Sequence, residues 1–183
     1  MNRIVSSIFV LVAMICGACT GGNEQEKKLV AEMRLFKSEA ITLPNNLIAK
    51  HVDDQTLPES SLLKRPLKLV IYISQEGCGD CKLRALIPIY MFILENNHLN
   101  HFGVIIILNP ADEESAFISL KYMRFRHTVF FDLDGSFERL NPHLPKNGQF
   151  HTFLLNKDNK VVLIGNPLQN EQMKKLYLTE MNR

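Results

Sequence analysis

The sequence lacks several features that define large classes of proteins. Its 21 Lys and Arg nearly balance its 19 Asp and Glu, and no basic cluster stands out, which argues against nucleic-acid binding. Four cysteines in 183 residues are too few for a disulfide-dense miniature scaffold. Internal repeats, a phosphate-binding loop, a dinucleotide-binding glycine pattern and a Ser-His-Asp order are all missing. The remaining composition, 46% hydrophobic and 22% charged, is typical of a globular domain.

The first residues predict an export signal. Arg3 precedes an apolar run over residues 4–15, which is too short to span a bilayer as a helix. Residues 13–20 resemble a bacterial lipoprotein signal, in which a cysteine that follows small residues becomes lipidated. Cys19 follows two small residues and is a better anchor than Cys16, which follows a bulky one. The alternative is an ordinary signal peptide.

This resemblance divides the chain. Residues 1–18 would be a lipoprotein signal peptide, and Cys19 would hold the protein to a membrane surface in the cell envelope, facing the periplasm or the outside. Residues 19–28 predict a flexible polar tether. Residues 29–66 predict an N-terminal extension of mixed character, and residues 67–183 predict the folded domain.

The order of elements in this domain predicts an α/β fold. Apolar, β-branched runs predict strands over residues 67–74, 104–108, 127–132, 150–156 and 161–164. Helical spacing and capping residues predict helices over residues 82–96 with a kink at Pro88, from Asn109-Pro110 onward, and over residues 169–181. Short strands that alternate with helices imply a sheet with parallel members and helices on both faces.

Cys78 and Cys81, which are separated by two residues in a CxxC pattern, predict thiol–disulfide exchange. Cys78 follows the first strand and would lie at a helix N-terminus, where the exposed N–H groups favour a thiolate that attacks a disulfide. Cys81, one turn later, is placed to resolve the mixed disulfide. Asp80 opposes the thiolate, whereas Lys82 and Arg84 favour it. A less stabilised thiolate gives a more reducing couple, so we predict a reductant.

A strand that ends in CxxC at the start of a helix, followed by βαβ and a β-hairpin with a helix, resembles the thioredoxin fold. The insertion before the hairpin and the lipid anchor are similar to those of TlpA/ResA-type, membrane-anchored thiol–disulfide oxidoreductases of the bacterial envelope. The resemblance covers about residues 67–181. It implies a central mixed sheet flanked by helices, no organic cofactor, and two partners: a dithiol electron donor and a disulfide-bearing protein substrate.

The chain departs from this family at two positions. Gly77 stands where the family usually has Trp, and His151 stands where it has a cis-Pro before the residue that aligns with Thr152. The family's loop at this point faces the CxxC and guides the substrate backbone, so the resemblance implies that His151 and Thr152 flank the substrate groove. A cis bond without Pro costs roughly 3–4 kcal/mol, so we expect the bond to be trans.

Three alternatives remain open for the cysteines. The first is a stable disulfide without turnover. The second is a thioredoxin-fold protein that binds or delivers a metal, with two thiolates and an imidazole, from Cys78, Cys81 and His151, as ligands for copper or zinc. The third is a redox-inactive, lipid-anchored binding module. His98 and His101 have a spacing that a metal site could use, but their place at a helix end favours capping.

Overall fold

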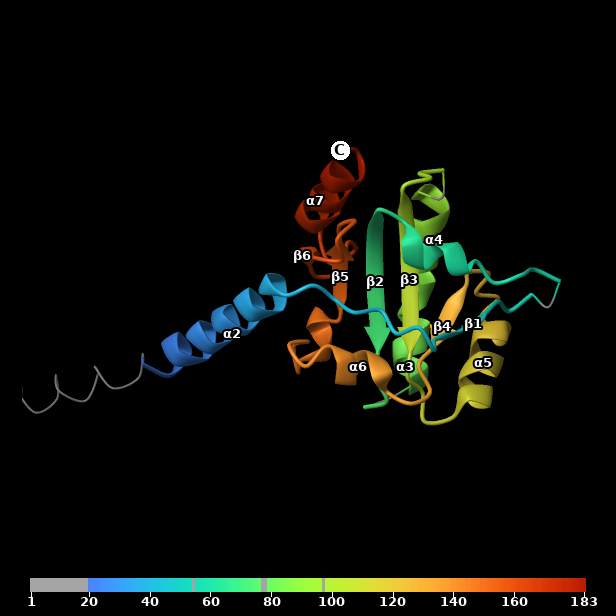
Figure 1. The fold of residues 1–183 in the computed structure, drawn as a ribbon, viewed down its shortest axis with the longest axis horizontal. Helices are drawn as coiled ribbons and strands as arrows, with labels where there is room; N and C mark the ends of the chain where they lie inside the picture. The colour runs from blue at the N-terminus through green and yellow to red at the C-terminus, as the bar shows by residue number, and fades with distance from the viewer. Residues whose placement is uncertain (1–19, 54, 77–78, 97) are drawn as a thin grey trace, which may run out of the picture. The chain divides into compact units, whose positions relative to one another are not determined.

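A mixed β-sheet organises the folded part of the chain (Figure 1). The computed structural model describes residues 20–53, 55–76, 79–96 and 98–183. Its strands are β1 (Ile48–Lys50), β2 (Leu67–Ile73), β3 (Phe102–Leu108), β4 (Val129–Phe131), β5 (Thr152–Leu155) and β6 (Val161–Ile164). They lie in the order β1-β4-β3-β2-β5-β6, in which β2, β3 and β4 are parallel and the other pairings antiparallel. The strands expected after residue 67 are present, whereas β1 was not expected.

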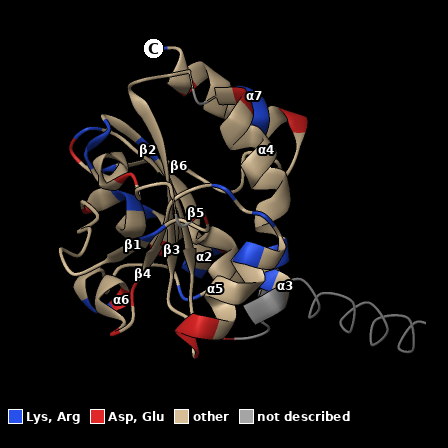
Figure 2. Ribbon diagram, turned by 90° about the vertical axis from the view of Figure 1, so that its right-hand side faces the viewer, with Lys and Arg blue, Asp and Glu red and all other residues tan. Residues whose placement is uncertain are grey.

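Helices cover both faces of this sheet, as Figure 2 shows with the strands between them. One face carries α3 (Gly79–Arg84), α4 (Leu86–Asn96), α5 (Glu113–Tyr122) and α7 (Glu171–Met181). The other face carries η1 (Ser60–Lys64) and α6 (Ser136–Leu140). Because successive side chains of a strand point to opposite faces, Leu69 and Ile71 of β2 enter the first core, whereas Val70 and Tyr72 enter the second.

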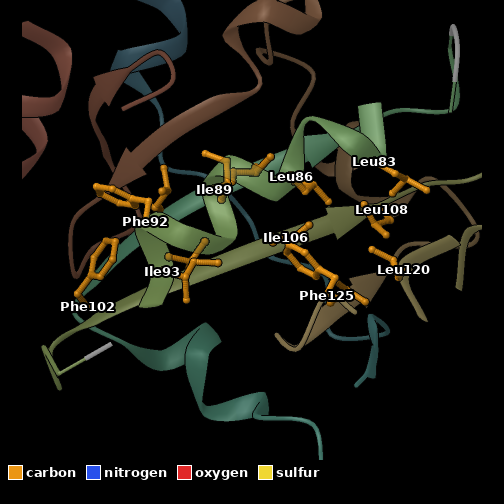
Figure 3. Packing of buried hydrophobic residues seen from close by; sticks show 14 of the residues in the cluster. Leu83, Leu86, Ile89, Phe92, Ile93, Phe102, Ile106, Leu108, Leu120 and Phe125 are labelled. Carbon is orange, nitrogen blue, oxygen red and sulfur yellow. The ribbon is translucent and has the colours of Figure 1, made fainter. Parts of the chain in front are cut away.

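The first core fixes α3, the helix that contains Cys81. Leu83 of α3 is buried, and α4 continues the apolar face with residues such as Leu86 and Ile89. Figure 3 shows these side chains directed toward Ile106 and Leu108 of β3. α3 is therefore held against the sheet by Leu83 and by the apolar face of α4 that follows it.

The predicted kink at Pro88 is a break between two helices. α3 ends at Arg84 and α4 begins at Leu86. Pro88 has no N–H to donate to the carbonyl of Arg84, and its ring clashes with that carbonyl, so the helix cannot continue unbroken. Pro88 itself lies in the first turn of α4, where its missing N–H costs least.

The cap of α5 differs from the expectation. We expected Asn109-Pro110 to cap and start this helix, but the N-cap is Asp112, whose side chain accepts a hydrogen bond from the Ser115 amide at 3.1 Å. Asp112 has extended backbone angles, as an N-cap requires. Asn109 instead continues the ladder, because its amide donates to the Ile73 carbonyl at 2.9 Å.

The segment expected to be a flexible tether is helical. α2 spans Thr20–Ser38 and includes the described part of residues 19–28. The two glycines at its start favoured a tether, but the Glu and Lys residues that follow are strong helix formers, and Glu24 lies one turn before Lys28. Of the helices that the structure describes, none combines the length and the hydrophobicity that crossing a membrane requires.

The compact unit also begins earlier than expected. It runs over residues 36–183, and the described residues before it, 20–35, belong to a separate unit. The expected extension over residues 29–66 therefore contributes to the domain: Phe36 and Ile41 are buried in the second core, and β1 pairs with β4. Residues in this segment are held by contacts with distant parts of the chain, which no local pattern displays.

Candidate functional site

Cys81, the described cysteine of the CxxC, follows β2, a strand in the middle of the sheet. β2 ends at Ile73, and Cys81 is in α3, the first helix after this strand. Cys81 is exposed and disulfide-bonded. The other three cysteines lie outside the described residues, and these include the predicted attacking thiol, Cys78, and the predicted anchor, Cys19.

Lys82 ties the start of α3 to the loop before it. Its ammonium donates to the backbone carbonyl of Ser74 at 3.3 Å, to the Ser74 hydroxyl at 3.4 Å and to the carbonyl of Glu76. Its positive charge is therefore directed toward residues 74–76, which connect β2 to the CxxC. This arrangement places a fixed cation beside the segment that carries the cysteines.

His151 lies across from this loop, at the end of the short helix η2 (Gly148–Phe150). Its Nε2 is 2.7 Å from the Pro145 carbonyl, so this nitrogen carries the proton and donates it, which leaves Nδ1 as an acceptor. The ring is buried and packs at 5.4 Å from the Tyr72 ring. Burial lowers the pKa of His151, so the imidazole is neutral at pH 7.

The backbone on either side of His151 is part of the sheet. The His151 carbonyl accepts from the Tyr72 amide at 2.9 Å, and Thr152 opens β5 opposite Ile71 of β2. No peptide bond in the described part of the chain is cis, so the bond between Phe150 and His151, where the family has its cis-Pro bond, is trans, as expected. The pairing with β2 holds both residues at the end of the sheet where α3 begins.

A cavity of about 180 Å³ joins the two sides of the site. Lys82 of α3 lines it together with His151 and Thr152 of the β5 loop. Its apolar lining comes from the two neighbouring elements, β2 and α4, through residues such as Ile71 and Ile89. The structure therefore brings together the predicted groove residues and the residue that follows Cys81.

A larger and more polar hollow of about 860 Å³ shares Lys82 and His151 with this cavity. Glu138 of α6 and Glu76 contribute carboxylates to it. The sequence interpretation missed Glu138 and Ser74, because Glu138 lies on α6, far from the CxxC in the chain, and carries no motif. Ser74 could have been found, since it follows a buried parallel strand at the edge where ligands commonly bind.

The phenol of Tyr72 lies between the sheet and α6. It accepts a hydrogen bond from the Asn109 side chain at 3.5 Å, and its ring packs at 4.8 Å from that of Phe137. Burial raises the pKa of Tyr72 far above its usual range, so the phenol stays protonated at every physiological pH. It serves as a rigid wall of the site rather than as an acid.

Metal-ligand geometry is absent from the part of the site that the structure describes. Among residues 20–53, 55–76, 79–96 and 98–183, no three His, Cys, Asp or Glu side chains cluster as ligands. Cys78, one of the three expected ligands, lies outside these residues. His101, set aside as a cap, binds the end of α7 instead of its own helix: its Nε2 is 2.8 Å from the Met181 carbonyl.

Comparison of the whole sequence with known families finds no family model that matches, and no curated protein matches it either. Solved structures do resemble the fold. A protein described as a thiol:disulfide interchange protein DsbE, from Chlorobium tepidum, is 18% identical with a TM-score of 0.54, over 78% of this chain and 97% of that one.

Two Bacteroides structures match in the same way. A thiol-disulfide oxidoreductase from Bacteroides fragilis is 13% identical with a TM-score of 0.53, over 78% of this chain and 99% of that one. The C-terminal domain of a protein described as a thiol-disulfide oxidoreductase from Bacteroides thetaiotaomicron is 13% identical with a TM-score of 0.54, over 80% and 98%. These likenesses, together with the strand order, show that the chain has a thioredoxin-like α/β fold.

Proposed function

We propose that the protein is a lipid-anchored thiol–disulfide oxidoreductase of the bacterial cell envelope that acts as a reductant through Cys78 and Cys81. One observation carries the proposal: Cys81 is disulfide-bonded and exposed in the first helix after the central strand β2, within a thioredoxin-like fold. A bond at an accessible helix start can be reached by another thiol, whereas a purely structural bridge has no need of such a place.

The reaction is a pair of thiol–disulfide exchanges. The Cys78 thiolate attacks a sulfur of the partner's disulfide, so a mixed disulfide forms and a partner thiolate leaves. The Cys81 thiolate then attacks the mixed disulfide, which releases the reduced partner and leaves the Cys78–Cys81 disulfide. A dithiol electron donor reduces this disulfide again by the same two steps and is itself oxidised, so two electrons and two protons pass from donor to partner.

The residues around Cys81 have separate roles in this proposal. Lys82 supplies a cation fixed to the preceding loop, which favours a thiolate nearby. His151 stands where a substrate backbone would pass and, being neutral, adds no charge to the groove. Thr152 lies beside His151 on the wall of the same groove, since both residues line the cavity together with Lys82.

The test is a trapping experiment on the full-length protein in detergent, with a peptide that contains one disulfide. In Cys81→Ser the attack proceeds but the resolution does not, so a mixed disulfide with the peptide accumulates and is seen as a mass increase. Cys78→Ser traps no adduct under the same conditions, and multiple turnover is lost in both variants. Trapping by Cys78→Ser alone would reverse the two roles, and turnover that survives in both variants would refute the proposal.

The lipid anchor is tested separately, because it does not depend on redox activity. The Cys19→Ser protein is expected in the soluble fraction of the envelope, whereas the unaltered protein and Cys81→Ser are expected in the membrane fraction. Membrane association that persists in Cys19→Ser would contradict the anchor and leave the exchange reaction in place.

A further inference from the structure

A groove of about 430 Å³ lies on the same face of the sheet as the CxxC helix, outside the cavity described above. It is formed where α5 packs beside α3 and the start of α4. The labels α3, α4 and α5 mark this face in Figure 2. The side chains that shape the groove are Leu83, Arg84, Ile87, Ile118, Tyr122 and Met123.

The walls of this groove are apolar and open to solvent. Leu83 is buried at its floor, while Ile87 is 48% exposed, Ile118 is 58% exposed and Tyr122 is 88% exposed. On α4 the exposed apolar stripe continues from Ile87 through Met91 to Leu94, one helical turn apart each time. Large apolar side chains that gather around a concavity mark an interaction surface rather than the scattered exposure of ordinary proteins.

The charges in the two segments that supply the walls of the groove have one sign, and the exposed Glu114 lies one turn earlier on α5. Residues 81–94 and 117–126, which supply its walls, contain no Asp or Glu and five cations: Lys82, Arg84, Lys121, Arg124 and Arg126. Arg84, Lys121 and Arg124 are exposed. A partner that is complementary to this surface therefore carries carboxylates next to apolar side chains.

The groove and the candidate redox site are both built on α3. Leu83 and Arg84 lie two and three positions after Cys81 in α3, so a polypeptide that lies in the groove contacts the helix that carries Cys81. Its hollow shape accepts individual side chains, which suits a polypeptide better than a flat lipid surface.

We infer that this groove binds an acidic, apolar segment of the disulfide-bearing partner protein. The inference rests on the proposed function for the nature of the partner, but the binding itself needs no thiol chemistry. In this arrangement the segment's apolar side chains occupy the space between Ile87, Ile118 and Tyr122, and its carboxylates face the cations of α3 and the end of α5. The groove then selects partners, and the cysteines act on them.

The binding test uses the full-length protein in nanodiscs of uncharged lipid and three fluorescent peptides without cysteine. The first alternates apolar residues with Glu, the second replaces Glu by Lys, and the third replaces the apolar residues by Ser. The first peptide is expected to bind at least tenfold more tightly than the other two, and its affinity is expected to fall as salt is raised. Equal affinity for all three peptides would overturn the inference.

Matched variants locate the binding. Ile118→Ser and Lys121→Gln are each expected to weaken the first peptide about tenfold. The controls are Leu140→Ser, at a leucine on α6 that is also exposed, and Lys157→Gln, at an exposed lysine in the turn between β5 and β6. Neither is expected to change the affinity. Unchanged affinity in both groove variants would overturn the inference. So would anionic vesicles that bind in place of the peptide with the same sensitivity to Ile118→Ser.

Exchange rates separate this inference from the proposed function. The rate with a disulfide carried by the acidic, apolar peptide, divided by the rate with glutathione disulfide, is expected to fall about tenfold in Ile118→Ser. Exchange with glutathione but no peptide binding would overturn the groove and leave the proposed function standing. Peptide binding that is lost in Ile118→Ser, without any exchange, would support the groove and refute the proposed function.

Discussion

Two histidines, the buried His151 and the half-buried His127, show how single residues of this protein respond to pH. His127 is held by its Nε2, 2.8 Å from the Val104 carbonyl, and His151 by its Nε2 near the Pro145 carbonyl. Burial lowers the pKa of both imidazoles, because the interior penalises the charged form. In the folded protein both rings therefore stay neutral at a pH where the unfolded chain already binds protons.

The resulting stability depends on pH with a defined sign. Because the unfolded chain takes up the proton first, stability is fully present above the ordinary histidine pKa of about 6.5 and falls as the pH drops toward the lowered values. Each proton contributes a slope of at most about 1.4 kcal/mol per pH unit. Urea unfolding at a series of pH values from about 7.5 to 5 measures how the free energy of unfolding changes with pH. The variant His127→Gln is expected to show a weaker dependence. A free energy of unfolding that rises with acidification would contradict this account.

Some residue positions in the site were predictable from the sequence and others were not. The position of Cys81 at the start of a helix after a strand was predictable, because apolar runs and breaks lie next to it in the chain. The hydrogen bond of His151 to Pro145 was not, since it depends on the path of the loop before β5. The carboxylate of Glu138 reaches the site only because α6 folds back against the end of β2.

At the scale of elements, the start of α6 depends on one buried carboxylate. Asp132, directly after β4, accepts from the Ser136 amide at 2.9 Å, from the Ser136 hydroxyl at 2.7 Å and from the Phe137 amide at 2.9 Å. Gly135 allows the tight turn, because its φ of 65° is left-handed. α6 in turn supplies Glu138 to the polar hollow of the site.

Removing the buried Asp132 carboxylate is expected to lower the free energy of unfolding more than removing an exposed helix cap. Asp132→Ala leaves the Phe137 amide without an acceptor, and the Ser136 amide and hydroxyl keep only their longer bonds to Asp134 and Asn46. We therefore expect a loss of about 2–3 kcal/mol in the free energy of unfolding. Asp112→Ala, which uncaps the exposed start of α5, is expected to cost about 1 kcal/mol. Denaturant unfolding of the two variants side by side measures the difference, and equal losses would show that burial of the cap is unimportant.

Elements with strong local patterns were predictable, and those stabilised by distant contacts were not. β2, β3 and the hairpin of β5 and β6 follow from apolar runs and turn residues. β1 has only three residues and exists because it pairs with β4 and Phe36 and Ile41 pack nearby. In α2 the two N-terminal glycines favour a flexible segment, but the run of good helix formers after them makes the segment helical.

For the whole molecule, the thioredoxin-like fold explains how distant residues meet at one edge of the sheet. Because β5 runs antiparallel to β2, the loop that leads into β5 lies beside the end of β2, close to where Cys81 follows in α3. The order of elements made this fold predictable from the sequence. The groove between α3 and α5 was not predictable, because it depends on which apolar side chains the packing of two helices leaves exposed.

The central claim is that Cys78 and Cys81 form a reversible redox couple. The most direct test is the reduction potential of the full-length protein, equilibrated with glutathione buffers and trapped by alkylation, with Cys78→Ser as the control. The account predicts a single two-electron transition between roughly −180 and −300 mV, within the range of dithiols that turn over. A disulfide that stays oxidised in the most reducing buffer would contradict it and identify a structural bridge.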